Sequence, residues 1–280
     1  MDKIGISKSI LSITSPGTHL TPKDHQLAAK ITRETNQEIS DICARYPDRF
    51  SFFAALPLPD IDSSLTEIDY ALDHLGAVGF GVVTNAHGHY LGDASLDPVF
   101  AKLNVRKTIL FMHPTTCHSL QDPTVTKPLD KYPSPMLEFM FDTTRAVTNL
   151  LLSGTVKKYP NITYLVSHCG AAIPALVERF VSFSMNILGQ DGAITSQEVK
   201  DLFKTRFYFD LAGAVFPDLI HGYLRVSDTS RLLYGSDYPY TPEKGTAILS
   251  DVMDKGLKEL FDEKTIEQIY SGNAKALLSL

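Results

Sequence analysis

The chain of 280 residues contains no tryptophan, three cysteines and no long hydrophobic run. The odd number of cysteines (Cys43, Cys117 and Cys169), without C-x-x-C spacing, argues against a disulfide framework and a cysteine zinc site. No apolar run reaches the roughly 18 residues that a membrane span needs. The amino-terminal segment Met1–Ile6 lacks the pattern of a signal peptide. These absences favour a protein of the reducing cytoplasm.

The chain also lacks an excess of positive charge. Its net charge of −6 argues against nucleic acid as the main partner. Hydrophobic residues make up 44% and charged residues 21% of the sequence, which is ordinary for a soluble globular protein. No linker, shift in composition or repeat divides the chain. We therefore expect one domain over residues 1–280, which is a size that α/β barrels reach as single domains.

Apolar, β-branched runs alternate along the chain with longer helical patterns. The runs are continuous rather than alternating in polarity, as expected for parallel strands that are covered on both faces. The predicted strands are Ser9–Ile13, Phe50–Leu56, Gly79–Thr84, Ile109–Met112, Ile162–Ser167, Phe207–Leu211 and Leu232–Gly235. The predicted helices are Pro22–Tyr46, Asp62–His74, Asp97–Leu103, Pro135–Lys158, Pro174–Leu188, Phe216–Val226, Lys244–Gly256 and Glu263–Leu280.

Seven strands, each with a following helix, predict a TIM-like (β/α)8 barrel that lacks one strand. A doubly wound open sheet is the structural alternative. No G-x-G-x-x-G motif follows the first predicted strand, which argues against that alternative.

Three of the predicted strands end on a residue that can bind a metal or move a proton. His113, before Pro114, is a candidate metal ligand or a histidine that is hydrogen-bonded at a strand end. His168 is a candidate ligand or a general base, with the same structural alternative. Its neighbour Cys169 is better interpreted as a small buried hydrophobic residue than as a thiolate. Because the carboxyl ends of barrel strands collect the chemistry, these residues predict one site.

Asp237 is the strongest single candidate because it directly follows the strand Leu232–Gly235. A buried carboxylate is costly unless it is paired or bound to a metal. The alternative is that Asp237 caps the next helix. Pro239 and Pro242 lie between Asp237 and that helix, which argues against simple capping.

The other histidines are less specific. His87 and His89 have the spacing of a two-ligand metal motif, but the preceding strand has already ended and glycines mark a loop. A contact of this loop with substrate is favoured over metal ligation. The remaining histidines are interpreted as surface or loop residues: His19, His25, His74, His118 and His221. Of these, His118 is a candidate for the border of the pocket.

Segments spread over nearly the whole chain carry a resemblance to a known family. The most specific are Phe111–Pro114, Ser167–Gly170 and Leu233–Pro239; the others are Leu11–Gly17, Gly79–Asn85, Tyr90–Asp93, Asp97–Phe100 and Gly272–Ala274. Through them the chain resembles the amidohydrolase-related metal-dependent decarboxylases. These include the aminocarboxymuconate semialdehyde, γ-resorcylate and, most similar, the fungal 6-methylsalicylate decarboxylases.

The resemblance implies roles for particular residues. His113 and Asp237 match metal ligands, with zinc as the usual ion and manganese as the alternative. His168 matches the catalytic histidine beside the metal, and Asp237 is the implied proton donor. Arg179, eleven residues beyond His168, matches an arginine that binds the substrate carboxylate, in some members across a homodimer interface. From spacing alone, Arg179 is interpreted as part of a salt bridge on a helix surface.

The implied function is non-oxidative decarboxylation of a small aromatic acid of the salicylate or orsellinate type, in aromatic polyketide secondary metabolism. The sequence departs from the family in one respect. These 280 residues do not contain the family's first strand with its H-x-H metal ligands. Met1 then resembles an internal methionine of a longer ancestor, or the recorded start is misplaced. The alternatives are a hydrolase of the same superfamily, a lactonase or amidase, or a truncated relic with impaired catalysis.

Overall fold

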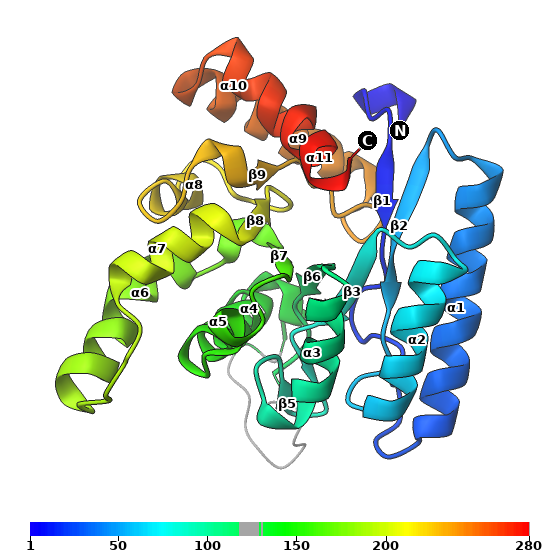
Figure 1. The fold of residues 1–280 in the computed structure, drawn as a ribbon. Helices are drawn as coiled ribbons and strands as arrows, with labels where there is room; N and C mark the ends of the chain where they lie inside the picture. The colour runs from blue at the N-terminus through cyan, green and yellow to red at the C-terminus, as the bar shows by residue number, and fades with distance from the viewer. Residues whose placement is uncertain (118–128, 130, 280) are drawn as a thin grey trace. The chain divides into compact units, whose positions relative to one another are not determined.

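The computed structural model describes residues 1–117, 129 and 131–279 (Figure 1). The chain divides into two compact units, Met1–Thr163 and Tyr164–Leu280, which are described in turn. The expectation of a single domain over residues 1–280 stays a prediction. His118 lies outside the described residues. Within those residues no helix has the length and hydropathy of a membrane span.

In the first unit, parallel strands pair in the order β1, β2, β3, β6, so that consecutive long strands along the chain are neighbours. They span Ser9–Leu11, Phe50–Ala55, Gly79–Val83 and Ile109–His113. Val83 at the end of β3 lies opposite His113 at the end of β6. After β3, the short strands β4 (Asn85–Ala86) and β5 (His89–Tyr90) form an antiparallel hairpin.

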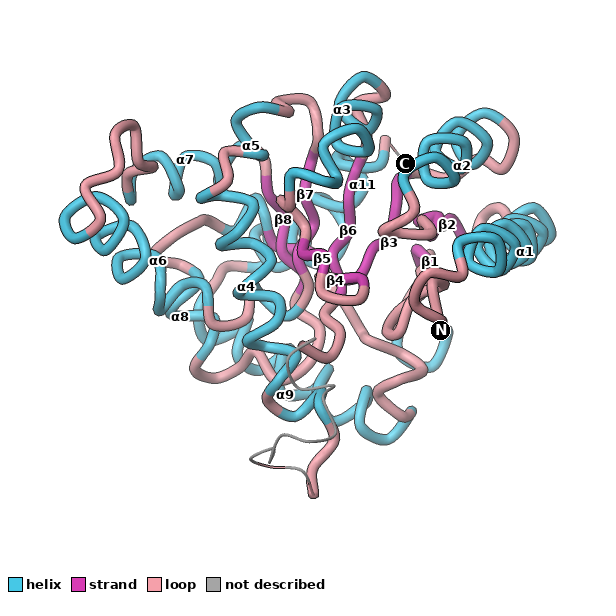
Figure 2. The backbone as a smooth tube through the Cα atoms, turned by 90° about the horizontal axis from the view of Figure 1, so that it is seen from below, coloured by secondary structure: helices cyan, strands magenta, loops and turns pink. Residues whose placement is uncertain are grey.

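The helices of this unit follow the strands. Figures 1 and 2 show α1 and α2 side by side next to strands β1 to β3. The helices are α1 (His25–Arg45), α2 (Ile61–Asp73), α3 (Asp97–Val105), α4 (Glu138–Leu152) and α5 (Thr155–Lys158). Short 3-10 turns cover Asp2–Ile4, Ala94–Leu96 and Ser134–Met136.

Aspartate caps determine where α1 and α2 begin. The side chain of Asp24 accepts a hydrogen bond from the backbone N–H of Leu27, at 3.1 Å. Asp60 caps α2 in the same way. Such caps satisfy backbone donors that have no partner within the helix. This is why α1 begins at His25 and not at the predicted Pro22.

The interior of the first unit explains the continuous apolar runs. Phe52, Phe80 and Leu110 on the strands are at most 1% exposed, and each contributes roughly 1.5–3 kcal/mol by leaving water. One buried polar residue, Asn36 of α1, accepts a hydrogen bond from the backbone N–H of Ala55 and donates one to its carbonyl oxygen, at 2.8 and 3.0 Å. Asn36 thus replaces the bonds that a neighbouring strand would give at the end of β2.

In the second unit, parallel strands pair in the order β7 (Thr163–Val166), β8 (Phe207–Asp210), β9 (Leu232–Leu233). Its helices are α6 (Ile173–Ser182), α7 (Ser196–Thr205), α8 (Leu219–Tyr223), α9 (Glu243–Leu260), α10 (Glu263–Glu267) and α11 (Asn273–Leu278). Short 3-10 turns cover His168–Gly170 and Thr229–Arg231, and π-helical turns cover Phe183–Ile187 and Gln268–Gly272.

Stacked and edge-on aromatic rings fill the interior of the second unit. The ring of Phe207 lies 4.9 Å from that of Tyr164 and 5.2 Å from that of Phe203, between ring centroids. Phe209 lies 5.1 Å from Tyr223 in the same way. Each such pair stabilises the fold by about 0.5–1.5 kcal/mol beyond the contribution from the buried apolar area. These contacts hold β7 against β8 and thereby position the turns that follow these strands.

The predicted strands are confirmed, while several helices differ. The predicted helix Pro135–Lys158 is divided at Gly154, whose φ of 76° is left-handed and ends α4. Helix α7 was not predicted; it begins where Thr195 and Glu198 form a capping box. The predicted last helix is divided into α10, the π-helical turn and α11.

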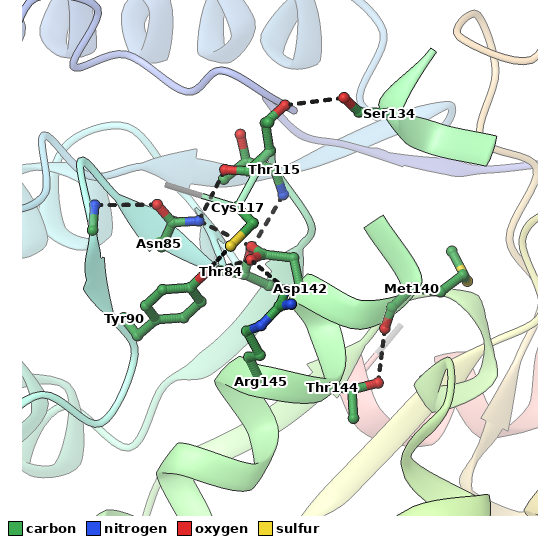
Figure 3. Close-up of polar contacts among 12 residues, drawn as sticks. Thr84, Asn85, Tyr90, Thr115, Cys117, Ser134, Met140, Asp142, Thr144 and Arg145 are labelled. Carbon is green, nitrogen blue, oxygen red and sulfur yellow. Dashed lines mark hydrogen bonds and ion pairs between the residues drawn. The ribbon is translucent and has the colours of Figure 1, made fainter. Parts of the chain in front are cut away.

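One buried carboxylate joins the segments that follow β3 and β6. Asp142 of α4 is fully buried and accepts hydrogen bonds from the Thr84 hydroxyl, the Asn85 amide and the Tyr90 hydroxyl (Figure 3). Thr84 Oγ1 in turn accepts the backbone N–H of Thr115 at 3.1 Å. Burial raises the pKa of Tyr90, which keeps its proton to donate. Asp142 therefore fixes the β4–β5 hairpin and the loop two residues beyond His113.

We expect Asp142→Ala to lower the free energy of unfolding by about 2–4 kcal/mol, because it leaves several buried donors without an acceptor. Urea denaturation of the purified chain measures this loss. The matched control is Asp41→Ala, which removes an exposed carboxylate that is bonded only locally to Gln37. Equal effects of the two substitutions would contradict the role given to Asp142.

Candidate metal and catalytic site

His113 is the last residue of β6 and is 9% exposed. Its Nδ1 lies 2.8 Å from the carbonyl oxygen of Pro114 and 2.9 Å from Thr14 Oγ1. The carbonyl can only accept, so Nδ1 carries a proton, and in the neutral form of the ring the lone pair is on Nε2, which lies 3.3 Å from Thr14 Oγ1. The Phe139 ring lies edge-on to the imidazole, with 6.0 Å between centroids. A neutral imidazole with Nε2 as donor atom is the form that binds metals.

His168 and Asp237 come together in the second unit. His168 lies two residues beyond β7 and Asp237 four residues beyond β9, and both have a left-handed backbone, with φ of 55° and 54°. A ring nitrogen of His168 and a carboxylate oxygen of Asp237 lie within 4.8 Å of each other. Left-handed conformations of non-glycine residues cost energy and are concentrated at functional sites.

Asp210 at the end of β8 holds the turn that presents His168. Its carboxylate accepts the backbone N–H of His168 at 2.9 Å and that of Ala212 at 3.0 Å. A Cβ on Gly170 would lie 3.1 Å from the Phe209 ring, and this glycine has φ of 77°. The turn therefore requires glycine at position 170, and it requires the Asp210 carboxylate as the acceptor of its backbone N–H groups.

The electrostatics of His168 favour the neutral imidazole. Burial lowers the pKa of His168, and the nearby charge of Asp237 opposes this effect. The Cys169 thiol is fully buried, which raises its pKa well above the ordinary value. Cys169 is therefore a protonated, buried side chain, as the sequence indicated, and not a thiolate.

Asp237 is not the cap of the following helix. Helix α9 begins at Glu243, and its N-cap position is Pro242. The carboxylate of Asp237 instead accepts the Thr241 hydroxyl at 3.1 Å, and its carbonyl accepts the Thr241 N–H at 2.8 Å. These bonds close the turn and orient the carboxylate.

The remaining candidates make other contacts. Arg179 is exposed on α6, with its guanidinium carbon 5.3 Å from the centroid of the Phe183 ring. His87 and His89 have different partners: His87 bonds His19, whereas His89 is exposed, with Nδ1 3.5 Å from Ser95 Oγ. The interpretation that His87 and His89 do not form a metal pair stays a prediction.

A cavity of about 190 Å³ lies in the first unit beside the ends of β1, β2 and β3. Its walls are mainly aliphatic, with polar side chains on part of the lining: Thr18, His19, Asn85, His87 and Thr115. His19 lies in a loop, as expected, but is 6% exposed and not on the surface. No local pattern in the sequence indicates this cluster, because its members come from segments far apart in the chain.

The chain belongs to the amidohydrolase family, whose model matches residues 12–280. Decarboxylase macB of Penicillium terrestre is 36% identical over 244 residues, which are 84% of this chain and 70% of that protein. The 6-methylsalicylic acid decarboxylase of Penicillium expansum is 30% identical over 276 residues, 97% of this chain and 82% of that protein. The resemblance drawn from the sequence is thus confirmed.

Solved structures confirm the fold class. A crystal structure of an amidohydrolase II covers all of this chain and 86% of its own, with a TM-score of 0.88 and 31% identity. The 5-carboxyvanillate decarboxylase of Novosphingobium aromaticivorans, solved with manganese and a nitrobenzoic acid, covers 100% of this chain and 78% of its own, with a TM-score of 0.85 and 25% identity. The chain therefore has the TIM-like fold of this family, with seven strands of the parallel sheet among the residues that the structure describes.

The buried His19 makes the metal-free protein sensitive to acid. Burial, then the neighbouring His87 and His25, lower the pKa of His19, while Asp60 opposes them. Below the ordinary pKa of about 6.5 the unfolded chain binds a proton that the folded chain does not, so stability is lost as pH falls. We expect His19→Gln to reduce the slope of unfolding free energy between pH 7 and 5, by at most about 1.4 kcal/mol per pH unit.

Urea denaturation at a series of pH values, with chelator present, tests this expectation. His74→Gln, at an exposed histidine after α2, is the matched control. Identical slopes for the wild type and His19→Gln would show that His19 titrates normally in the folded protein.

Proposed function

We propose that the chain is a metal-dependent, non-oxidative decarboxylase of a small aromatic acid with a hydroxyl ortho to the carboxylate. The observation that carries this proposal is the 30% identity to a 6-methylsalicylic acid decarboxylase over 97% of the chain. A second protein with this name, from Aspergillus aculeatus, is 30% identical over 95% of the chain. The substrate class thus follows from relatives that extend over nearly all of these residues.

The donor set supports the metal. His113 offers Nε2, and His168 and Asp237 offer an imidazole and a carboxylate that already lie close together. Imidazole and carboxylate are the ligand types that His113 and Asp237 offer, and both occur in zinc sites. We propose that His113 and Asp237 hold one divalent ion, with His168 as its catalytic neighbour: zinc, as the resemblance implies, or manganese, which the 5-carboxyvanillate decarboxylase contains.

When bound, the ion supplies Lewis-acid stabilisation of the negative charge on the carboxylate and phenolate oxygens. The residues of the chain move the proton. Asp237 in its protonated form donates to the ring carbon that bears the carboxylate. The bond from that carbon to the carboxylate then breaks, its electron pair restores the aromatic ring, and CO2 leaves. Proton transfer by a positioned side chain contributes about 10²–10⁴-fold to a rate.

His168 assists in this scheme as the neutral neighbour of Asp237. Because burial lowers its pKa, the imidazole can accept a proton and return it to the carboxylate. Arg179 is proposed to bind the substrate carboxylate across a homodimer interface, which agrees with its exposure on α6. Cytoplasmic location and a role in secondary metabolism stay predictions.

We expect Asp237→Asn and His168→Ala to lower CO2 release from salicylate-type acids by about 10²-fold or more, and His113→Ala to lower bound metal and activity together. His221→Ala, at an exposed histidine of α8, is the control and should keep full activity.

Activity with added Zn²⁺ or Mn²⁺ and metal content by mass spectrometry are measured on each purified variant. Near-full activity of Asp237→Asn would refute the assignment. Ring opening or amide hydrolysis without CO2 would indicate a hydrolase.

Arg179→Ala should raise KM for the aromatic acid at least tenfold, because a charge-assisted contact to a carboxylate is worth about 1.5–3 kcal/mol. Arg225→Ala, an exposed arginine in the same unit, is the control. Steady-state kinetics at constant metal content separate KM from kcat. An unchanged KM would leave Arg179 as a surface residue that contacts Phe183.

A further inference from the structure

Three histidines from three segments of the first unit meet beside the cavity. They are His19 in the loop after β1, His25 at the start of α1 and His87 in the turn between β4 and β5. His19 Nδ1 lies 3.0 Å from His87 Nε2, and His19 Nε2 lies 3.2 Å from His25 Nδ1. His87 Nε2 also lies 2.8 Å from the carbonyl oxygen of His19.

We propose that His19 and His87 form a second metal site, for a divalent ion that prefers imidazole, of the class of Ni²⁺, Cu²⁺ or Zn²⁺. Ligands about 2.0–2.1 Å from an ion, at angles of about 90–110°, are about 2.8–3.4 Å apart. The 3.0 Å between the two ring nitrogens fits this spacing, and the carbonyl oxygen of His19 lies 2.8 Å from the same nitrogen of His87. Two imidazoles and one carbonyl oxygen thus converge as donors.

The hydrogen bonds arrange the correct tautomer of His19. With its proton on Nε2, His19 donates to Nδ1 of His25 and keeps the lone pair on Nδ1, toward His87. Ligating histidines are commonly oriented by such a bond from the other ring nitrogen. In the metal-free protein, His87 Nε2–H donates to the His19 carbonyl oxygen. On binding, His87 carries its proton on Nδ1 and the ion replaces this hydrogen bond.

Burial and backbone conformation prepare both ligands. His19 is 6% exposed, and its burial keeps the imidazole neutral at neutral pH, which is the form that binds metals. His87 has a left-handed backbone, with φ of 51°, and Gly88 follows with φ of 91°. The side chain of Asn85 accepts the backbone N–H of Gly88 at 3.2 Å and closes the turn. The turn therefore directs the imidazole of His87 toward His19.

This site is distinct from the one proposed for catalysis, because the two share no residue. The donor types differ as well. A pair of imidazoles suits Ni²⁺, Cu²⁺ and Zn²⁺, whereas Mn²⁺ favours carboxylate and carbonyl oxygens. His19 and His87 both line the cavity of about 190 Å³, so an ion bound there faces that cavity. The inference does not depend on the proposed decarboxylase activity.

Calorimetric titration of the full-length chain with Ni²⁺ tests the proposal. One Ni²⁺ should still bind after His113→Ala, which removes a donor of the other site. His19→Gln and His87→Asn, each added to His113→Ala, should lower the affinity at least 100-fold; asparagine is chosen because it tolerates a positive φ. His25→Gln should lower it about 10–100-fold. His74→Gln is the control and should change nothing. Thermal unfolding checks that each variant folds.

A second measurement uses the unaltered protein. In ¹H–¹⁵N spectra of the imidazoles, substoichiometric Ni²⁺ should broaden the signals of His19 and His87 before those of His74 and His221. Affinity for Ni²⁺ that is unchanged by His19→Gln and His87→Asn, or broadening confined to other histidines, would overturn the proposal. The cluster would then be a hydrogen-bonded network only.

Discussion

Buried polar side chains must be fully hydrogen-bonded, and in this protein their bonds fix the turns that follow the strands. Asn36 bonds the end of β2, Asp142 bonds the segments after β3 and β6, and Asp210 bonds the turn after β7. Each of these residues is less than a tenth exposed. The candidate donors His113 and His168 lie next to such bonded turns, so their positions depend on the satisfaction of these groups.

Much of the fold could be predicted because parallel strands that are covered on both faces read as continuous apolar runs. Helix ends were less predictable. Asp24 moves the start of α1 to His25, and Gly154 divides a helix that the apolar pattern presents as continuous. Helix α7 was missed although Thr195 and Glu198 carry the signal of a capping box. These are local effects that compete with the apolar pattern.

The candidate site was predictable where a possible ligand lies at the end of a strand or within four residues beyond it, as His113, His168 and Asp237 do. Asp210 carries the same signal, because it ends the run Phe207–Asp210, but a structural role could only be seen from its bonds to backbone N–H groups. Nothing local marks Asp142 as important, since its partners Thr84 and Tyr90 are 58 and 52 residues away. The contacts among the histidines of the cavity are equally non-local.

The proposed role of His113 and Asp237 in this amidohydrolase-family chain is to bind one divalent ion, with His168 as the catalytic neighbour. An anomalous-scattering map from crystals grown with Mn²⁺ tests it most directly. We expect a single strong peak that is coordinated by a ring nitrogen of His113 and a carboxylate oxygen of Asp237. A well-ordered crystal with no peak among these residues, or with a peak held by other side chains, would contradict the account.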